Sequence, residues 1–194
     1  PVGPENRLWY RRTFTIPEKW TADKKRVLLH FGAVDWDATV TVNGRQVGTH
    51  RGGYDPFTFD LTDALKPTGP QEIVVSVWDP TDAGDQPRGK QVRKPEGIWY
   101  TAVTGIWQTV WLEPVAAGHI ETTRITPDLD GSVVVVEATA ESDVPDTRIK
   151  VEVMDGGSPV ASAEAGLMNQ AIRPIRAKLT LKIPNAKSWS PDSP

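Results

Sequence analysis

The stretch GIWYTAVTGIWQTVWLEP, residues 97–114, holds three of the chain's eight tryptophans: Trp99, Trp107 and Trp111. Because side chains alternate across a strand, a strand over residues 106–112 carries mostly apolar side chains on both faces. This pattern is typical of a strand that is covered by other parts of the protein on both faces. The pattern therefore favours Trp107 and Trp111 as scaffold residues that pack under a loop or against a neighbouring domain. Trp99 follows a long polar segment, where its ring either packs structurally or faces a ligand.

The composition excludes several classes of protein. The 194 residues contain no cysteine, which excludes disulfides, thiol catalysis and cysteine-based zinc sites. The net charge of −3 has no basic excess of the kind that nucleic-acid binding needs. No apolar run approaches the roughly 18 residues of a membrane helix. We therefore expect neither nucleic acid nor membrane as a partner, and the compartment stays open.

The distribution of residues along the chain predicts two domains, both built from β-strands. The 16 glycines and 17 prolines are spread between short apolar runs, and no helical periodicity is visible. Fourteen of the 15 aromatic residues precede residue 115, and only Trp189 follows it. Two domains with different cores, residues 1–115 and 116–194, explain this shift better than one. The Pro- and Gly-bearing segment 113–121 is the natural joint.

One hairpin in the first region carries a specific turn signal. Valines and threonines alternate over residues 39–42, and Asn43-Gly44 follows directly. This dipeptide favours the two positive φ angles of a type I′ turn between antiparallel strands. The sequence therefore predicts a β-hairpin centred on these two residues.

The second region shows five strand-like segments over about 75 residues, with turn-forming residues between them. Their spacing suits an immunoglobulin-like sandwich, which needs about seven strands. We therefore expect this sandwich to be incomplete at its C-terminus. Uncovered strand edges readily pair with another chain, so edge pairing between copies, and hence a homo-oligomer, is an expectation.

Two groups of acidic residues are candidates for catalysis or metal binding. Asp35 and Asp37 lie two apart, but catalytic carboxylate pairs usually converge from separate elements, so a solvated strand edge or turn is the simpler interpretation. Asp79, Asp82 and Asp85 do not follow the spacing of an EF-hand calcium loop, and turn formation explains them better. No catalytic constellation, metal site or cofactor motif emerges from residues and spacing alone. Residues and spacing alone therefore predict two aromatic-rich β-sandwiches and leave a binding role open.

An ordered set of motifs goes further. It comprises LWYRRTFTIP, LLHFGAVDWDATVTVNGRQVGTHRGGYDPFTFDLTDAL, IVVSVWDP, GKQ and the stretch at 97–114. Together they closely resemble the N-terminal region of glycoside hydrolase family 2, the β-galactosidase, β-glucuronidase and β-mannosidase group. The most specific parts are VNGRQVG and GIWQTVWL. The resemblance is strong over residues 5–115 and weaker over 116–194, where SWSPDSP is similar to a family stretch.

The resemblance implies an all-β fold, with a jelly-roll sugar-binding domain over 1–115 and an immunoglobulin-like sandwich over 116–194. It places the two catalytic glutamates in a later (β/α)₈ barrel, so no catalytic residue is assigned here. It implies no cofactor or metal. The expected function is that of the non-catalytic N-terminal region of a retaining exo-glycosidase, β-galactosidase-like, that hydrolyses terminal β-linked sugars. This region alone is expected to be inactive.

The resemblance also implies partners and a site. The partners are a carbohydrate substrate and the chain's own catalytic barrel, and a periplasmic or extracellular bacterial location is expected. In the family, a loop of the jelly roll helps to shape the sugar pocket, and the matching segment here is 79–97. The candidate substrate-binding residues are Asp82, Lys90, Gln91, Glu96 and Trp99.

Two alternatives stay open. The chain could be a free-standing carbohydrate-binding module, or a tandem β-sandwich protein of adhesion or spacing. Sugar binding by the chain alone would favour the module.

Overall fold

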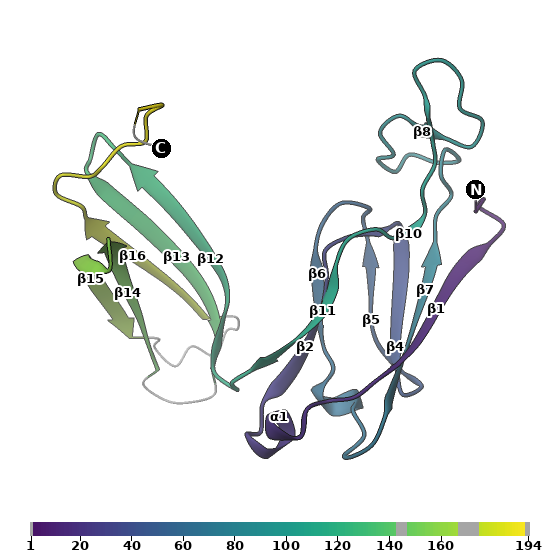
Figure 1. The fold of residues 1–194 in the computed structure, drawn as a ribbon, viewed down its shortest axis with the longest axis horizontal. Coiled ribbons are helices and arrows are strands. Elements are labelled where there is room, and N and C mark those ends of the chain that lie inside the picture. The colour runs from purple at the N-terminus through teal and green to yellow at the C-terminus, as the bar shows by residue number, and fades with distance from the viewer. Residues whose placement is uncertain (1, 143–146, 167–174, 193–194) are drawn as a thin grey trace. The chain divides into compact units, whose positions relative to one another are not determined.

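The structure is a computed structural model that describes residues 2–142, 147–166 and 175–192 (Figure 1). The chain forms two compact units, Pro1–Ala116 and Ala117–Pro194. Nearly all the regular structure consists of β-strands, which confirms the prediction of an all-β protein. Each unit is built from sheets that enclose its own hydrophobic core.

The first unit is a sandwich of two main antiparallel sheets. The four-stranded sheet has the order β1 (Arg7–Phe14), β7 (Gln71–Trp78), β4 (Asp37–Val42), β5 (Arg45–Arg51). The three-stranded sheet has the order β11 (Val110–Val115), β2 (Arg26–Phe31), β6 (Phe57–Asp60). The chain passes repeatedly from one sheet to the other, as Figure 1 shows.

The core of this unit follows from strict alternation. In β4 the side chains of Ala38, Val40 and Val42 are fully buried, while the intervening threonines are partly exposed. From the opposite sheet, Phe31 of β2 is 1% exposed, and its ring stacks on Phe57 of β6 with centroids 4.8 Å apart. Aliphatic side chains and the Phe31 ring thus meet between the two sheets.

The predicted hairpin turn is confirmed. Asn43 and Gly44 have φ angles of 50° and 82°, and the turn joins β4 to β5. The Asn43 side chain also ties the turn to its surroundings. Its Nδ2 donates to the Ala64 carbonyl at 2.8 Å, and its Oδ1 accepts from the Glu72 amide at 3.0 Å. These bonds reach the first residues of β7 and fix the turn against the sheet.

The strand predicted over residues 106–112 is interrupted, which corrects the sequence interpretation. β10 (Gly105–Ile106) pairs with β3 (Val34–Asp35), whereas β11 pairs with β2 in the three-stranded sheet. Residues 107–109 carry the chain from one pairing to the other. Because the two halves belong to different ladders, the side chains of 106–112 do not alternate as those of one strand.

Two short helical elements lie between strands of the first unit. They are α1 (Glu18–Ala22) and the 3₁₀ turn η1 (Thr62–Ala64). Both are shorter than two helical turns, so they carry no readable helical periodicity.

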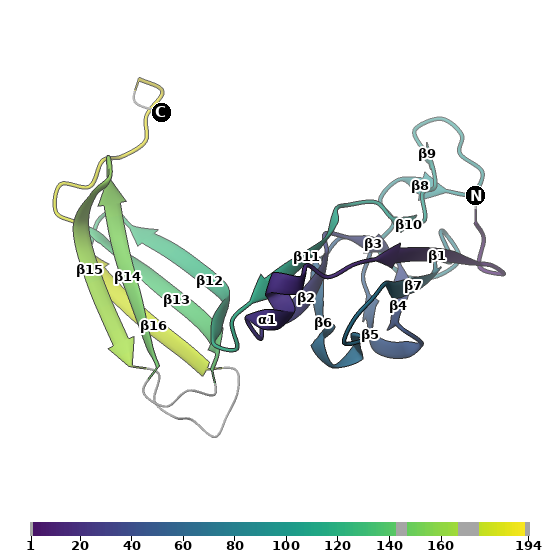
Figure 2. The same cartoon turned by 60° about the horizontal axis from the view of Figure 1, so that its bottom comes forward.

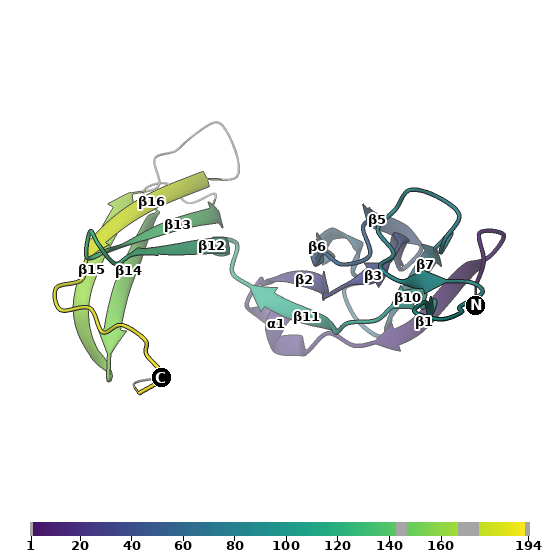
Figure 3. The same ribbon diagram turned by 90° about the horizontal axis from the view of Figure 1, so that it is seen from above.

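The second unit consists of two facing sheets (Figures 2 and 3). One contains β12 (His119–Asp128), β13 (Val133–Glu141) and β16 (Ile175–Lys182), with β13 in the middle. The other pairs β14 (Arg148–Asp155) with β15 (Ser158–Gly166). Its core is aliphatic, with Val136, Ile149 and Leu179 among the buried side chains.

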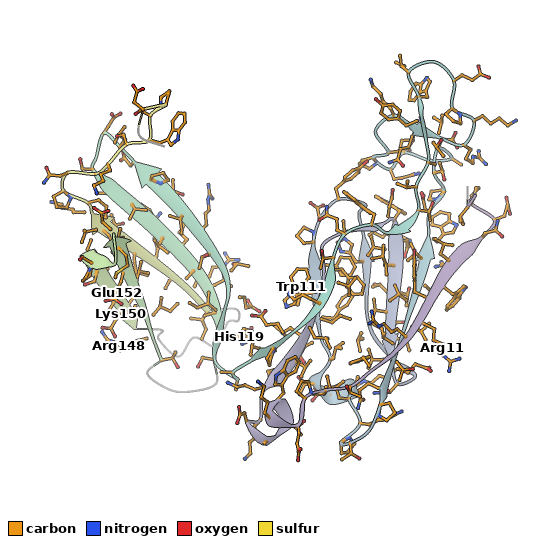
Figure 4. The ribbon with its side chains drawn as sticks, viewed as in Figure 1. Arg11, Trp111, His119, Arg148, Lys150 and Glu152 are labelled. Atoms are coloured by element: carbon orange, nitrogen blue, oxygen red, sulfur yellow. The ribbon has the colours of Figure 1, made fainter. Side chains whose placement is uncertain are left out.

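Strand β14 shows how one face of this unit meets solvent. Arg148, Lys150 and Glu152 alternate along it (Figure 4) and are exposed, while Ile149 between them is buried. Lys150 Nζ lies 2.9 Å from Glu152 Oε1. The alternation of charged and apolar residues thus places the aliphatic side chains in the core.

Candidate functional site

The candidate site lies on the long segment between the end of β7 and the start of β10. Within it, β8 (Gln91–Val92) and β9 (Tyr100–Thr101) form a short parallel pair. Figure 1 shows this segment at the end of the first unit away from α1. Residues 79–104, called the site loop below, contain all five candidate binding residues.

The site loop forms an open hollow on its surface. The hollow is lined by Asp82, Val92, Arg93, Lys94, Glu96, Gly97 and Trp99. Trp99 is 43% exposed, and its amide donates to the Glu96 carbonyl at 3.2 Å across a turn in which Gly97 has a φ of 60°. This left-handed conformation favours glycine. The hollow therefore combines an accessible aromatic ring with both signs of charge.

Asp82 and Arg93 form an ion pair at the hollow. Arg93 Nε donates to Asp82 Oδ1 at 2.6 Å, and the Arg93 amide donates to Oδ2 at 3.2 Å. The side-chain hydrogen bond from Arg93, followed by its backbone hydrogen bond, lowers the pKa of Asp82 below its ordinary value. The Asp82 carboxylate is thus held in a fixed orientation.

The other two candidates support the loop. Gln91 Oε1 accepts from the Val103 amide at 2.7 Å, and the Lys90 carbonyl accepts from the Tyr100 amide at 2.8 Å. Neither residue is among those that line the hollow. The structure thus brings together Asp82, Glu96 and Trp99, while Lys90 and Gln91 hold the two sides of the loop to one another.

Trp107 and Trp111, which the sequence favours as scaffold residues under a loop or a neighbouring domain, are half exposed in the first unit. Their exposed fractions are 47% and 45%. Trp107 Nε1 donates to the Gly53 carbonyl at 2.7 Å. The ring of Trp111 stacks on that of His30, with centroids 4.7 Å apart. Trp107 also meets the Tyr54 ring edge-on, with centroids 6.1 Å apart. Both rings therefore make specific contacts and leave much of their surface accessible, because the predicted continuous strand is broken between them.

The burial of Asp35 also differs from the sequence interpretation. It was interpreted together with Asp37 as a solvated edge or turn, but Asp35 is only 8% exposed. Asp37 lies on a different strand and pairs with Arg51 at 2.8 Å. The acidic neighbour of Asp35 is Asp79, which is 3% exposed. These two come from separate elements, so spacing along the sequence gave no signal for the pair.

Burial changes the chemistry of this pair. Desolvation raises the pKa of Asp35 to about 6, and repulsion from the nearby Asp79 carboxylate adds to the rise. Asp79 itself accepts the Thr81 amide at 2.7 Å. An aspartate that accepts the amide two residues later is a typical turn former, as the sequence predicted for the acidic run.

Neither a metal centre nor a membrane span is found in the described parts of the chain. Across these residues, no group of three or more acidic or histidine side chains is arranged to hold a metal ion. No helix described in the structure has both the length and the apolar character needed to cross a bilayer.

The first unit is thus a β-sandwich that carries a polar loop with an open hollow. The family model for the sugar binding domain of glycosyl hydrolases family 2 matches residues 3–113. The chain belongs to this family, which confirms the resemblance seen in the motifs.

Individual proteins similar to this chain have names that fit the same family. The chain is 31% identical to a β-galactosidase of Thermoanaerobacter pseudethanolicus, over 96% of this chain and 24% of that protein. It is 26% identical to a β-glucuronidase of Paenibacillus borealis, over 95% of this chain and 31% of that protein. A solved family 2 member from Bacteroides cellulosilyticus superposes with a TM-score of 0.72 at 25% identity, covering 99% of this chain and 25% of the other. The chain thus spans about a quarter to a third of the length of these relatives.

Proposed function

We propose that this chain is the non-catalytic N-terminal region of a retaining exo-glycosidase that removes terminal β-linked sugars. Its site loop would form part of the pocket that receives the sugar. The hollow lined by Asp82, Glu96 and Trp99 carries this proposal. The catalytic glutamates would come from a barrel that follows in the same protein, as the family resemblance implies.

The chemistry of the hollow suits a sugar. A sugar ring presents a C–H surface that packs on an aromatic face, and hydroxyls that need donors and acceptors in fixed positions. Trp99 offers the ring. The oriented Asp82 carboxylate and the neighbouring Glu96 offer acceptors, and Lys94 offers donors. A ligand group here would meet side chains that are already partly held in place.

The size of the relatives favours a glycosidase over a free-standing module. The curated relatives are three to four times longer than the part that this chain matches. We propose that the first unit serves as the jelly-roll domain and the second as an immunoglobulin-like domain beside the catalytic barrel. Edge pairing of the second unit between copies stays a prediction.

The test is Trp99→Ala in the full-length protein. Removing an aromatic contact worth about 1.5 kcal/mol should lower kcat/KM roughly tenfold. The melting temperature should hardly change, because the ring is 43% exposed. Trp9→Ala is the matched control, since Trp9 is 68% exposed on β1 and does not line the hollow. Steady-state kinetics on nitrophenyl β-glycosides measures the effect.

Two outcomes would contradict the proposal. If Trp99→Ala mainly lowers the melting temperature, the residue is structural. If Trp9→Ala lowers kcat/KM as much as Trp99→Ala does, the hollow has no special part in substrate binding.

A further inference from the structure

The two ends of the site loop are joined by a single carboxylate. Asp79 follows β7 directly, and its Oδ1 accepts the Thr81 amide at 2.7 Å, at the first turn of the loop. Its Oδ2 accepts the Thr104 hydroxyl at 2.6 Å, just before β10. Asp79 therefore holds together the two ends of the site loop, which carries all five candidate residues.

A second buried carboxyl lies beside this junction. Asp35 is 8% exposed, and its strand β3 pairs with β10 so that Asp35 is opposite Gly105. In the described residues, no donor is hydrogen-bonded to the Asp35 carboxyl group. Gly53 closes the other side, because a methyl group built on it would lie 2.7 Å from Asp35 Oδ1. Asp35 is thus largely buried, and in the described residues no hydrogen bond to its carboxyl group compensates its charge.

The space between the two carboxyls is small. The cavity that they line measures about 10 Å³, too little for a sugar and at the lower limit for one water. Thr81, Gln86, Gln91 and Arg88 also line it. A buried carboxylate without a partner is costly, and two that share a site ionise together only with difficulty.

The charged groups around Asp35 define what its ionisation does. Asp79 faces it from the end of β7, and Arg88 faces the cavity from the site loop, where its Nη1 donates to the Asp82 carbonyl at 3.3 Å. Gly53 and Gly105 bring no charge, and the Tyr10 hydroxyl of β1 accepts the Ile106 amide beside them. A negative charge on Asp35 therefore acts mainly on Asp79.

We propose that Asp35 is a positioning residue whose protonation decides how firmly Asp79 holds the two ends of the site loop. Protonated Asp35 carries no charge and leaves Asp79 free to bind Thr81 and Thr104. Ionised Asp35 repels Asp79 and weakens both of these hydrogen bonds. The consequence for catalysis rests on the proposed function of the loop, whereas the holding of the loop does not.

The direction of the effect follows from burial. Since burial raises the pKa of Asp35 to about 6, the loop is held firmly in mildly acidic solution and more loosely above neutrality. In the glycosidase, a looser loop should raise KM more than it lowers kcat, because the loop binds the sugar and carries no reacting group.

Hydrogen exchange of the site loop tests the positioning role directly. On the 194-residue chain, protection of the peptide covering residues 80–104 is compared at pH 5 and pH 7.5 after correction for the intrinsic rate. Wild-type protection should fall by about tenfold, the change that one pKa unit of coupling produces. Asp35→Asn, which cannot ionise, should stay protected at both values. Asp37→Asn, which removes the acidic partner of Arg51, should behave as the wild type.

Each outcome of these measurements supports or contradicts the positioning role of Asp35. If wild-type protection does not change with pH, or if the change persists in Asp35→Asn, the positioning role is wrong. If Asp35→Asn fails to fold, Asp79→Asn takes its place, because removing the other charge should also abolish the pH effect. In the full-length enzyme, the ratio of wild-type KM to Asp35→Asn KM should rise several-fold from pH 5 to 7.5. If exchange follows the prediction and this ratio stays constant, the proposed function of the loop is wrong while the positioning role stands.

Discussion

The two units bury different kinds of residue. Among its described residues, the first unit encloses aliphatic side chains together with the Phe31 ring, and also five buried polar residues: Asp35, Gln71, Ser76, Asp79 and Thr81. In the described part of the second unit the core is aliphatic, and Ser142 is the one buried polar residue. Burying a polar group costs free energy unless it is hydrogen-bonded. Polar burial in the first unit therefore needs a structural or functional reason.

The buried polar groups of the first unit differ in how fully they are hydrogen-bonded. The Gln71 side chain is fully hydrogen-bonded, since its Oε1 accepts from Asn43 and Lys66 and its Nε2 donates to the carbonyls of Lys66 and Gly69. It fixes the loop before β7 and needs no other role. Asp35 has no such partners. The hydrogen bonds of Gln71 explain its burial as structural, whereas Asp35, beside the site loop, is a buried carboxyl group with a raised pKa.

The largest expected effect tests whether the two cores are independent. Phe31→Ala removes a ring that is 1% exposed and should lower the free energy of unfolding of the first unit by about 3–5 kcal/mol. Tryptophan fluorescence reports on this unit, because seven of the eight tryptophans precede residue 116. Leu179→Ala, in the core of the second unit, is the control and should leave the fluorescence transition in place. Equal shifts for both variants would show that the units unfold together.

The next effect is a pH dependence confined to the first unit. The folded-state pKa of Asp35 is raised from 3.8 to about 6, so the native state binds the proton more tightly than the unfolded chain does. As far as this group is concerned, stability is therefore highest below pH 4 and falls by at most about 3 kcal/mol as pH rises from about 4 to above 6. Urea unfolding followed by fluorescence, compared with Asp35→Asn, measures it.

The absence of this pH dependence would contradict the prediction. If the stability difference between Asp35→Asn and the wild type is the same at pH 4 and pH 7.5, Asp35 does not titrate as its burial implies.

The smallest effect concerns the solvated face of the second unit. Lys150→Ala removes an exposed ion pair with Glu152, which should cost no more than about 0.5 kcal/mol. Calorimetry of the chain should show an almost unchanged transition for the second unit, with little dependence on salt. A loss above about 1 kcal/mol would mean that the charged row on β14 stabilises the fold more than exposed pairs usually do.

Local signals made much of the fold readable. The Asn43-Gly44 turn needs only two residues with positive φ, and the five strands of the second region need only apolar runs between turns. The candidate site was readable in part. Polarity and family motifs found the site loop, and the structure places Asp82, Glu96 and Trp99 of its five candidates at one hollow. No local rule indicated that Lys90 and Gln91 would link the two sides of the loop instead.

The sequence by itself determined the all-β class, the hairpin turn, the site loop and the family, because each depends on neighbouring residues or on ordered motifs. Only the tertiary structure decided the break after Ile106, since that depends on which distant strand each segment pairs with. It alone also brought Asp35 against Asp79. Burial and the field of a neighbouring charge arise when distant segments meet, and so the acid that responds to pH near 6 has no signature in the chain.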